Sequence, residues 1–220
     1  METVYTIFFK DGAWLTILKG LLATIQISAP SLLFGTILGA GICFLRLNKF
    51  KPASVFAKIY ISVIQGSPVL MLLMLLFYGV FARTSLAPET VAVITFSMHT
   101  AAYVAELLRS ALMAVDTGQV EAARTLGFSK FQAFRLVTLP QLTKIAKPVY
   151  RSTIINLIQW TSVVGYVSIT DLTRVINNTA SRTMQPMITI IGGMLIYLAL
   201  SYIVNAVFAY TDNTAERRNQ

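Results

Sequence analysis

The last long apolar stretch of the chain, residues 186–210, has the sequence PMITIIGGMLIYLALSYIVNAVFAY and contains no charged residue. A helix of about 20 residues is long enough to cross the roughly 30 Å hydrocarbon core of a membrane. Four more apolar segments precede it, at about Gly12 to Leu45, Pro52 to Phe81, Pro88 to Val115 and Lys147 to Val167. The pattern predicts an all-α integral membrane protein, with five transmembrane helices forming a single domain over residues 1–220.

The composition supports a membrane protein and argues against several other classes. Hydrophobic residues make up 55% of the chain and charged residues 12%, against about 45–50% and 25% in soluble domains. The net charge of +9 is then explained by basic loops at a membrane surface, and we expect no nucleic-acid partner. Because Cys43 is the one cysteine and His99 the one histidine, we expect neither an internal disulfide nor a metal site.

The basic residues are distributed unevenly between the connections, which predicts an orientation. Twelve lie after the first segment, after the third segment or in the C-terminal tail: Arg46, Lys49, Lys51, Lys58, Arg124, Lys130, Arg135, Lys144, Lys147, Arg151, Arg217 and Arg218. Five belong to the opposite side: Lys10, Lys19, Arg83, Arg174 and Arg182. Since cytoplasmic loops are the basic ones, the N-terminus is predicted outside, and the C-terminus and the long loop at about 116–146 inside.

Ionisable residues inside a span are costly, so the third segment is a candidate functional element. His99, Tyr103 and Glu106 fall on one helix face, and Arg109 follows Glu106 by three residues. Residues three apart on a helix are neighbours, which predicts a Glu106–Arg109 pair. The pair either neutralises itself and fixes helix packing, or takes part in the translocation path.

The fourth segment carries a stripe of uncharged polar residues. Ser152, Asn156 and Gln159 are spaced at i, i+4 and i+7, with Ser162 at the flank of the stripe and Thr161 nearly opposite. In lipid such a stripe needs a polar partner, which is either a neighbouring helix or a hydrated cavity that holds a solute.

Glycine and proline mark two further positions in the spans. Gly35 and Gly39 form a small-xxx-small pair, which favours close approach of another helix. The second segment contains the break Gln65-Gly66-Ser67-Pro68, which is either an ordinary kink or a substrate-lining element of the kind found in transporters.

The long loop predicts two short, separately capped helices. Asp116 with Gln119 suggests a helix start, Gly127 suits the left-handed residue that ends a helix, and Ser129 with Gln132 suggests a capping box. We expect the second helix, which carries Phe131 and Phe134, to stop at Leu139-Pro140. Exposed aromatic residues on such a loop are typical of an element that docks on a partner protein.

The string Glu121-Ala122-Ala123, with Gly127 at its fixed distance and then Leu139-Pro140, resembles the EAA loop of ABC-importer permeases. Other strings resemble the polar amino-acid uptake subfamily, the histidine/glutamine/glutamate type: Ala102 to Arg109 (AYxAExxR), Gly118-Gln119, Phe134-Arg135, Gln141 after Leu139-Pro140, and the pair Thr161-Ser162. The resemblance covers about Lys58 to Arg174.

This resemblance implies a permease subunit in a bacterial inner membrane that is not itself an enzyme. It implies two ATP-binding partner subunits that hold ATP and magnesium, a second permease copy, identical or homologous, and an extracytoplasmic solute-binding protein. The substrate would be a polar amino acid or close analogue. The chain has no phosphate-binding loop, so we expect it to bind no cofactor.

The chain departs from the subfamily at two positions, each of which loses a positive charge. Gln65 stands where many relatives have Arg, and Gln159 stands where many have Lys. The predicted substrate path comprises Gln65, Ser67, Tyr103, Glu106, Asn156, Gln159, Thr161 and Ser162.

Two other function classes fit the composition less well. In a self-contained, ion-coupled transporter or channel, Glu106 and His99 would carry protons. Such a protein leaves the capped loop without a role. A membrane-embedded hydrolase would need a triad or a metal set, which the sequence does not suggest.

Overall fold

The computed structural model describes residues 5, 7–9 and 12–217, and every regular element among these is helical. The described chain divides into two compact units. The first takes residues up to 33, 67–97 and those from 154 onward, and the second takes residues 34–66 and 98–153. Three long helices contribute residues to both units: α2 (Ala13–Leu47), α5 (Pro88–Met113) and α8 (Leu139–Trp160).

Several of these helices can cross a membrane. By length and composition, α2, α5 and the first part of α10 (Pro186–Arg217) qualify, and there is a fourth span if the broken pair α3 (Lys51–Gly66) and residues 69–80 is counted as one. The break falls at Ser67–Pro68, within the predicted Gln65-Gly66-Ser67-Pro68 interruption. Three to four candidate spans are therefore present, and five remains a sequence prediction.

The core of the first unit is apolar and draws on segments far apart in sequence. It packs α4 (Val69–Met74), the π-helix η2 (Leu75–Val80) and the 3₁₀-helix η4 (Thr161–Val167) around the first half of α5. The buried core residues are Ile27, Leu73, Ala92, Phe96, Leu157, Val164, Val167 and Ile169.

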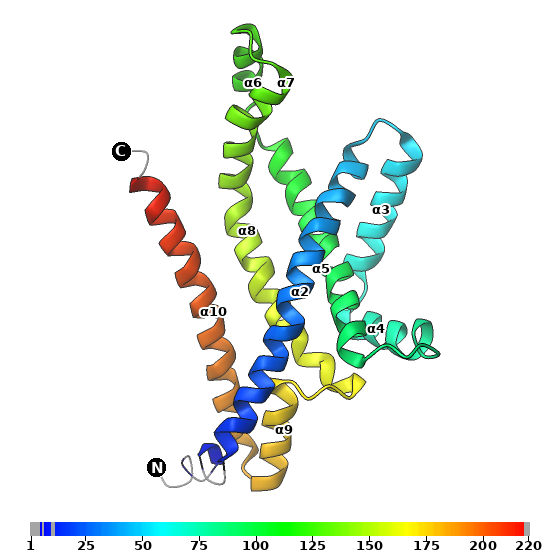
Figure 1. The fold of residues 1–220 in the computed structure, drawn as a ribbon, viewed down its shortest axis with the longest axis vertical. Coiled ribbons are helices and arrows are strands. Elements are labelled where there is room, and N and C mark those ends of the chain that lie inside the picture. The colour runs from blue at the N-terminus through cyan, green and yellow to red at the C-terminus, as the bar shows by residue number, and fades with distance from the viewer. Residues whose placement is uncertain (1–4, 6, 10–11, 218–220) are drawn as a thin grey trace. The chain divides into compact units, whose positions relative to one another are not determined.

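Helix α9 (Leu172–Thr183) completes this unit and packs against α10 (Figure 1). A β-carbon at Gly193 would lie 3.0 Å from the Ile176 side chain, so the two helices touch closely there. A β-carbon at Gly20 of α2 would lie 3.0 Å from the Leu172 Cα atom at the start of α9. These close approaches fix where α9 presents its polar residues.

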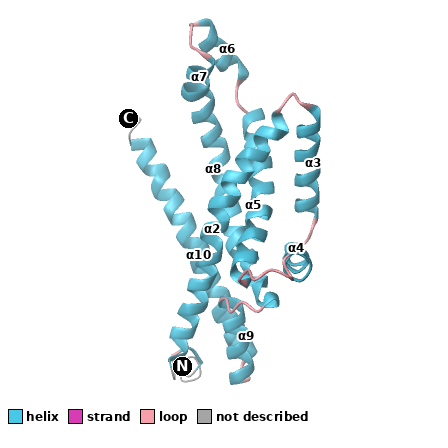
Figure 2. Ribbon diagram, turned by 45° about the vertical axis from the view of Figure 1, so that its right-hand side comes forward, coloured by secondary structure: helices cyan, strands magenta, loops and turns pink. Residues whose placement is uncertain are grey.

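The second unit contains the end of α2, α3, the second half of α5 and the start of α8, with α3 beside α5 (Figure 2). The Tyr60 hydroxyl donates to the Met98 carbonyl at 2.8 Å. The predicted close helix approach at Gly39 is confirmed, because a β-carbon there would lie 2.7 Å from the Val104 Cβ atom.

Between α5 and α8 lie α6 (Thr117–Thr125), α7 (Lys130–Ala133) and the π-helix η3 (Phe134–Thr138). The predicted stop at Leu139-Pro140 is wrong, since η3 leads directly into α8 and Pro140 is its second residue. Proline is tolerated in the first turn of a helix, where its missing N–H would have no intrahelical partner.

Candidate functional site

The loop between α5 and α8 starts with a side-chain cap. Asp116 is the N-cap of α6, and its Oδ1 atom accepts from the Gly118 N–H at 2.9 Å. Gln119 does not complete the predicted pair with Asp116. Its Oε1 atom accepts from Gln141 Nε2 at 2.9 Å, while Gln141 Oε1 accepts from the Asp116 N–H at 3.2 Å. Gln141 thereby ties the start of α6 to the first turn of α8.

The end of α6 is fixed by Gly127, as predicted. Its φ is +90°, and its N–H donates to the Arg124 carbonyl at 3.1 Å. The Phe128 N–H donates to the Ala123 carbonyl at 3.1 Å. These two bonds form a Schellman motif, which satisfies the last carbonyl groups of the helix and needs a left-handed residue.

The start of α7 is fixed by the predicted capping box. Ser129 Oγ accepts from the Gln132 N–H at 3.2 Å, and Gln132 Oε1 accepts from the Ser129 N–H at 2.7 Å. The chain therefore enters α7 at a defined angle immediately after the turn at Gly127, and the two short helices have fixed ends.

This pair of helices presents apolar side chains outward. Leu126 is 79% exposed and Phe131 is 70% exposed, whereas the small residues Ala123 and Ala133 are buried on the inner side. Glu121 and Ala122 are exposed on α6. Large apolar side chains held on a capped, polar loop indicate a surface made for a protein partner.

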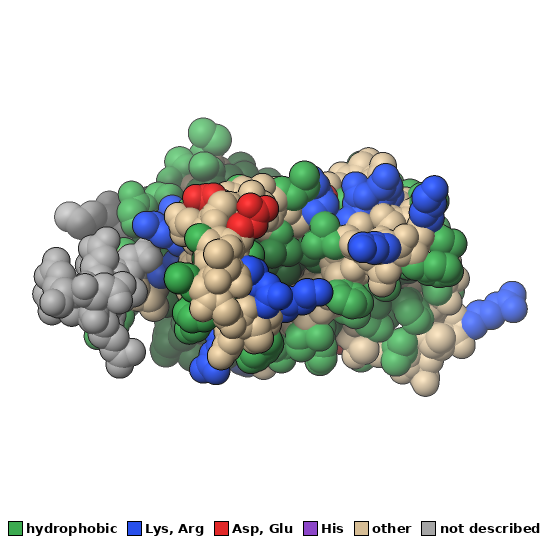
Figure 3. All heavy atoms as spheres, turned by 90° about the horizontal axis from the view of Figure 1, so that it is seen from above, with side chains coloured by type: hydrophobic (Ala, Val, Ile, Leu, Met, Phe, Trp, Pro, Cys, Tyr) green, Lys and Arg blue, Asp and Glu red, His purple; other side chains and the backbone are tan. Residues whose placement is uncertain are grey.

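The second unit, which carries this loop, is strongly basic. It contains eleven Lys and Arg residues and three acidic residues, Glu106, Asp116 and Glu121. Figure 3 is seen from above Figure 1 and shows separate groups of blue Lys and Arg side chains and fewer red acidic ones among green and tan atoms. The charge agrees with a location at a cytoplasmic membrane surface.

The predicted Glu106–Arg109 pair on α5 is confirmed. Arg109 Nε donates to Glu106 Oε2 at 2.9 Å, and both side chains are half-buried. Nearby on the same helix, the His99 and Tyr103 rings contact each other with their centres 5.1 Å apart. Because Arg109 compensates the Glu106 carboxylate, this helix face carries little net charge.

The structure assigns the predicted path residues to different units. Gln65, Tyr103 and Glu106 belong to the second unit, where Gln65 Nε2 donates to the Ala102 carbonyl at 3.2 Å. The other five belong to the first unit: Ser67, Asn156, Gln159, Thr161 and Ser162.

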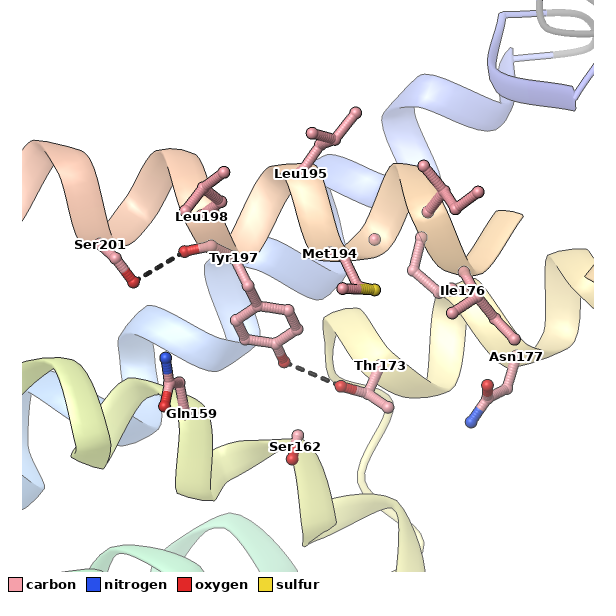
Figure 4. A pocket seen from close by; sticks show the side chains of 13 residues that line it. Gln159, Ser162, Thr173, Ile176, Asn177, Met194, Leu195, Tyr197, Leu198 and Ser201 are labelled. Atoms are coloured by element: carbon pink, nitrogen blue, oxygen red, sulfur yellow. Dashed lines mark hydrogen bonds between the residues drawn. The ribbon is translucent and has the colours of Figure 1, made fainter. Parts of the chain in front are cut away.

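A cavity of about 590 Å³ lies in the first unit between η4, α9 and α10 (Figure 4). Gln159 and Ser162 line it, whereas Asn156 is exposed elsewhere on α8, and the buried Thr161 hydroxyl donates to the Ile158 carbonyl at 2.7 Å. The full lining is Gln159, Ser162, Thr173, Ile176, Asn177, Ile190, Ile191, Gly193, Met194, Leu195, Tyr197, Leu198 and Ser201. The structure thus brings one member of the predicted polar stripe, Gln159, to this cavity together with Ser162 from the flank of the stripe.

Four polar lining residues were missed by sequence reasoning: Thr173, Asn177, Tyr197 and Ser201. Thr173 and Tyr197 bond to each other, with their hydroxyl oxygens 2.8 Å apart. The signal available in the sequence is the i, i+4 spacing of Thr173 and Asn177 and of Tyr197 and Ser201, which places each pair on one helix face.

Comparison with known proteins settles the family. The model of the family described as "binding-protein-dependent transport system inner membrane component" matches residues 31–217. The chain belongs to this family. The permease is therefore an integral inner-membrane component of a transport system, and the alternatives of an ion-coupled transporter and a hydrolase are set aside.

Two relatives of the permease come from Bacillus subtilis strain 168. A probable amino-acid ABC transporter permease protein, YckA, is 35% identical over 193 residues, which cover 87% of this chain and 85% of the relative. The L-cystine transport system permease protein TcyL is 34% identical over 207 residues, which cover 89% and 83%.

A solved structure has the same fold as the permease. The crystal structure described as an amino acid ABC transporter with histidines matches with a TM-score of 0.81 at 28% identity. The match covers 90% of this chain and 94% of that one. The fold is therefore that of an ABC-transporter permease.

Proposed function

We propose that the chain is the membrane-spanning permease subunit of a bacterial ABC importer, and that it carries a polar amino acid or close analogue across the inner membrane. The energy comes from ATP hydrolysis on a separate subunit. The observation that carries the proposal is the pair α6 and α7, whose ends are fixed by caps and whose apolar side chains point outward. A self-contained transporter, whose pathway lies within one chain, would not need such a surface.

The ATP-binding subunit is the proposed occupant of that surface. The coupling residues are Glu121, Ala122, Ala123, Gly127, Leu139 and Pro140. Glu121 and Ala122 are exposed on α6, and Leu139 and Pro140 open α8, so a push on the loop passes directly into a long helix. Rigid motion of α8 then converts ATPase closure into alternating access.

The proposed assembly has two ATP-binding subunits, two permease copies, identical or homologous, and a solute-binding protein outside. Five spans are too few to enclose a path, which is why a second permease is needed. ATP and magnesium belong to the partner subunits. Five spans, with the N-terminus outside and the coupling loop inside, agree with the basic charge of the second unit.

The proposed solute path is neutral rather than charged. Gln159 and Ser162 line the large cavity, and the Glu106 carboxylate is paired with Arg109. Uncharged donors and acceptors suit a zwitterion, which carries both signs of charge. The L-cystine transport function named for the relative TcyL agrees with such a substrate.

Reconstitution tests the proposal. We expect uptake of a radiolabelled amino acid into proteoliposomes to need ATP, the ATP-binding subunit and the binding protein. We also expect Phe131→Ser to weaken retention of the ATP-binding subunit about tenfold or more, because burying a Phe side chain contributes about 1.5–3 kcal/mol.

Phe50→Ser is the matched control, since Phe50 is 65% exposed in the connection between α2 and α3. It removes the same side chain without touching α6 or α7. Uptake that proceeds without ATP or a partner subunit would contradict the proposal, as would equal retention of the ATP-binding subunit by both variants.

A further inference from the structure

Arg174 is a positive charge that the proposed mechanism does not use. It lies in the first turn of α9, between the fourth and fifth apolar segments, and its side chain is half-buried. Its Nη1 atom donates to the Gly165 carbonyl at 2.6 Å. A guanidinium has five N–H donors in a fixed fork, so most of them remain available for a ligand.

Arg174 is not neutralised by the acid nearest to it in sequence. Asp171 is the N-cap of α9, and its two carboxylate oxygens accept from the backbone N–H groups of Thr173 and Arg174, each at 3.0 Å. Asp171 is fully buried, and this burial raises the pKa of its carboxyl group. Within the described part of the chain, the recorded ion pair is Arg109–Glu106, which does not involve Arg174.

Arg174 lines a second cavity of about 280 Å³ in the first unit. The residues around this cavity are rich in hydrogen-bonding side chains, including two exposed amides: Ser162, Gly165, Tyr166, Thr173, Arg174, Asn177 and Asn178. An unpaired guanidinium with amide and hydroxyl groups beside it suits an oxyanion, and Arg binds carboxylates with two parallel hydrogen bonds.

The two cavities adjoin, because Ser162, Thr173 and Asn177 line both. Of the described residues around the two cavities, Arg174 is the charged one, and the larger cavity is lined by neutral polar and aliphatic side chains. Figure 4 shows Ser162, Thr173 and Asn177 at the side of the larger cavity away from Leu195 and Leu198. The two adjoining cavities therefore have a positive charge at the Arg174 end, and the larger cavity is uncharged.

We propose that Arg174, with Asn177 and Asn178, binds the α-carboxylate of the transported amino acid, and that its uncharged side chain lies in the larger cavity. The inference rests on the proposed function, because it names the substrate class of that path as neutral L-amino acids. The Arg109 guanidinium of α5 is paired with Glu106, so it does not supply this charge. The bond from Arg174 to Gly165 orients the guanidinium at the junction.

A cysteine at the junction reports on binding without the binding protein. The chain has one cysteine, the buried Cys43, so Cys43→Ser with Ser162→Cys leaves one thiol that lines both cavities. Its alkylation by N-ethylmaleimide is followed in the purified complex of permease and ATP-binding subunit. The added compounds are L-glutamine, L-methionine and L-cystine, the α-amides of these three, L-glutamate and L-arginine.

We expect at least one of the neutral amino acids to slow alkylation, and its α-amide to be about tenfold or more weaker, since hydrogen bonds to charged groups are worth about 1.5–3 kcal/mol. We also expect L-glutamate and L-arginine to protect the thiol about tenfold or more weakly than the neutral amino acid does. We expect Arg174→Gln to remove this difference between the amino acid and its α-amide, and Arg174→Lys to keep only part of it, because an ammonium retains the charge but cannot form the two parallel hydrogen bonds. Arg182→Gln, on the exposed last turn of α9, leaves it unchanged.

Other results overturn the inference. These are equal protection by acid and amide, a ratio that survives in Arg174→Gln, or no protection by any compound. A purely structural Arg174 would lower stability or assembly without changing the ratio. If ATP-dependent uptake persists in such a case, the proposed function stands and this subsite fails, whereas uptake independent of ATP ends the proposed function itself.

Discussion

At the scale of single residues, Gln159 supplies a neutral amide to the larger cavity from the last turn of α8. We expect Gln159→Leu to lower the affinity of the path for its zwitterion roughly 10- to 150-fold, the range for losing one hydrogen bond to a charged group. The measurement is the concentration dependence of uptake per assembled complex in proteoliposomes.

Ser152→Ala is the control for Gln159→Leu, because Ser152 is exposed on the same helix and its hydroxyl donates to the Pro148 carbonyl at 3.3 Å. If Gln159 only packs against a neighbouring helix, the variant loses assembly or thermal stability, and uptake falls in proportion. Unchanged uptake per complex in Gln159→Leu would exclude Gln159 from the solute path.

A residue's contacts could be predicted from the sequence when its partner lies only a few positions away. The Glu106–Arg109 pair and the Ser129 capping box follow from spacing along one helix or turn. Arg174 faces the second cavity because α9 packs on η4, and Thr173 faces the larger one because α9 packs on α10, with Gly193 against Ile176. No periodicity within the sequence specifies that contact.

At the scale of elements, the turn between α6 and α7 has to hold one geometry. A β-carbon at Gly127 would have no atom within 4 Å, so a side chain there fits sterically and its cost comes from the φ of +90°. Left-handed backbone costs non-glycine residues about 1–2 kcal/mol. We expect Gly127→Asp to weaken binding of the ATP-binding subunit about 5- to 30-fold, measured by co-purification and by transport-linked ATP hydrolysis.

Gly127→Asn separates conformation from charge, because Asn tolerates the left-handed region better than other residues with a side chain and adds no charge. We expect it to bind the ATP-binding subunit more tightly than Gly127→Asp does. Full retention of that subunit and full transport-linked hydrolysis in Gly127→Asp would remove the coupling role of α6 and α7.

Helix type was harder to predict than helix position. The apolar segments predicted the positions of the long helices, and the capping residues predicted those of the short helices. The π turns η2 and η3 and the 3₁₀ turn η4 were not predicted, because apolar periodicity and caps locate helices and their ends but do not distinguish these turns from α-helix. The predicted stop at Pro140 failed because η3 ends at Thr138 and α8 begins at the next residue, with Pro140 in its first turn.

At the scale of the whole molecule, the described chain divides into two compact units, and the single permease domain over residues 1–220 stays a prediction. Each unit is closed by contacts between distant segments. In the first unit, Ser31 Oγ donates to the Val93 carbonyl at 3.4 Å, and in the second, the Thr36 and Tyr150 hydroxyl oxygens are 2.7 Å apart. Hydropathy finds the segments, but it carries no information on which of them pair.

The orientation of the whole chain gives the last prediction. Ten of the basic residues predicted on the cytoplasmic side lie in the second unit together with the loop between α5 and α8, and positive charge near span ends is retained on the cytoplasmic side. Arg218 and Lys10, like both chain ends, lie outside the described residues. We expect a fluorescent reporter fused after Gln220 to be cytoplasmic and an epitope tag at Met1 to be accessible from outside in spheroplasts.

Insertion of the same tag after Thr84, in the connection before α5, is the internal control and should also be accessible from outside. An odd number of spans puts the two termini on opposite sides, so external exposure of both ends would require an even count. It would then follow that residues 147–167, which are not among the candidate spans, do not cross the membrane. The basic loop would stay inside, and only the part of the chain beyond α8 would need a new topology.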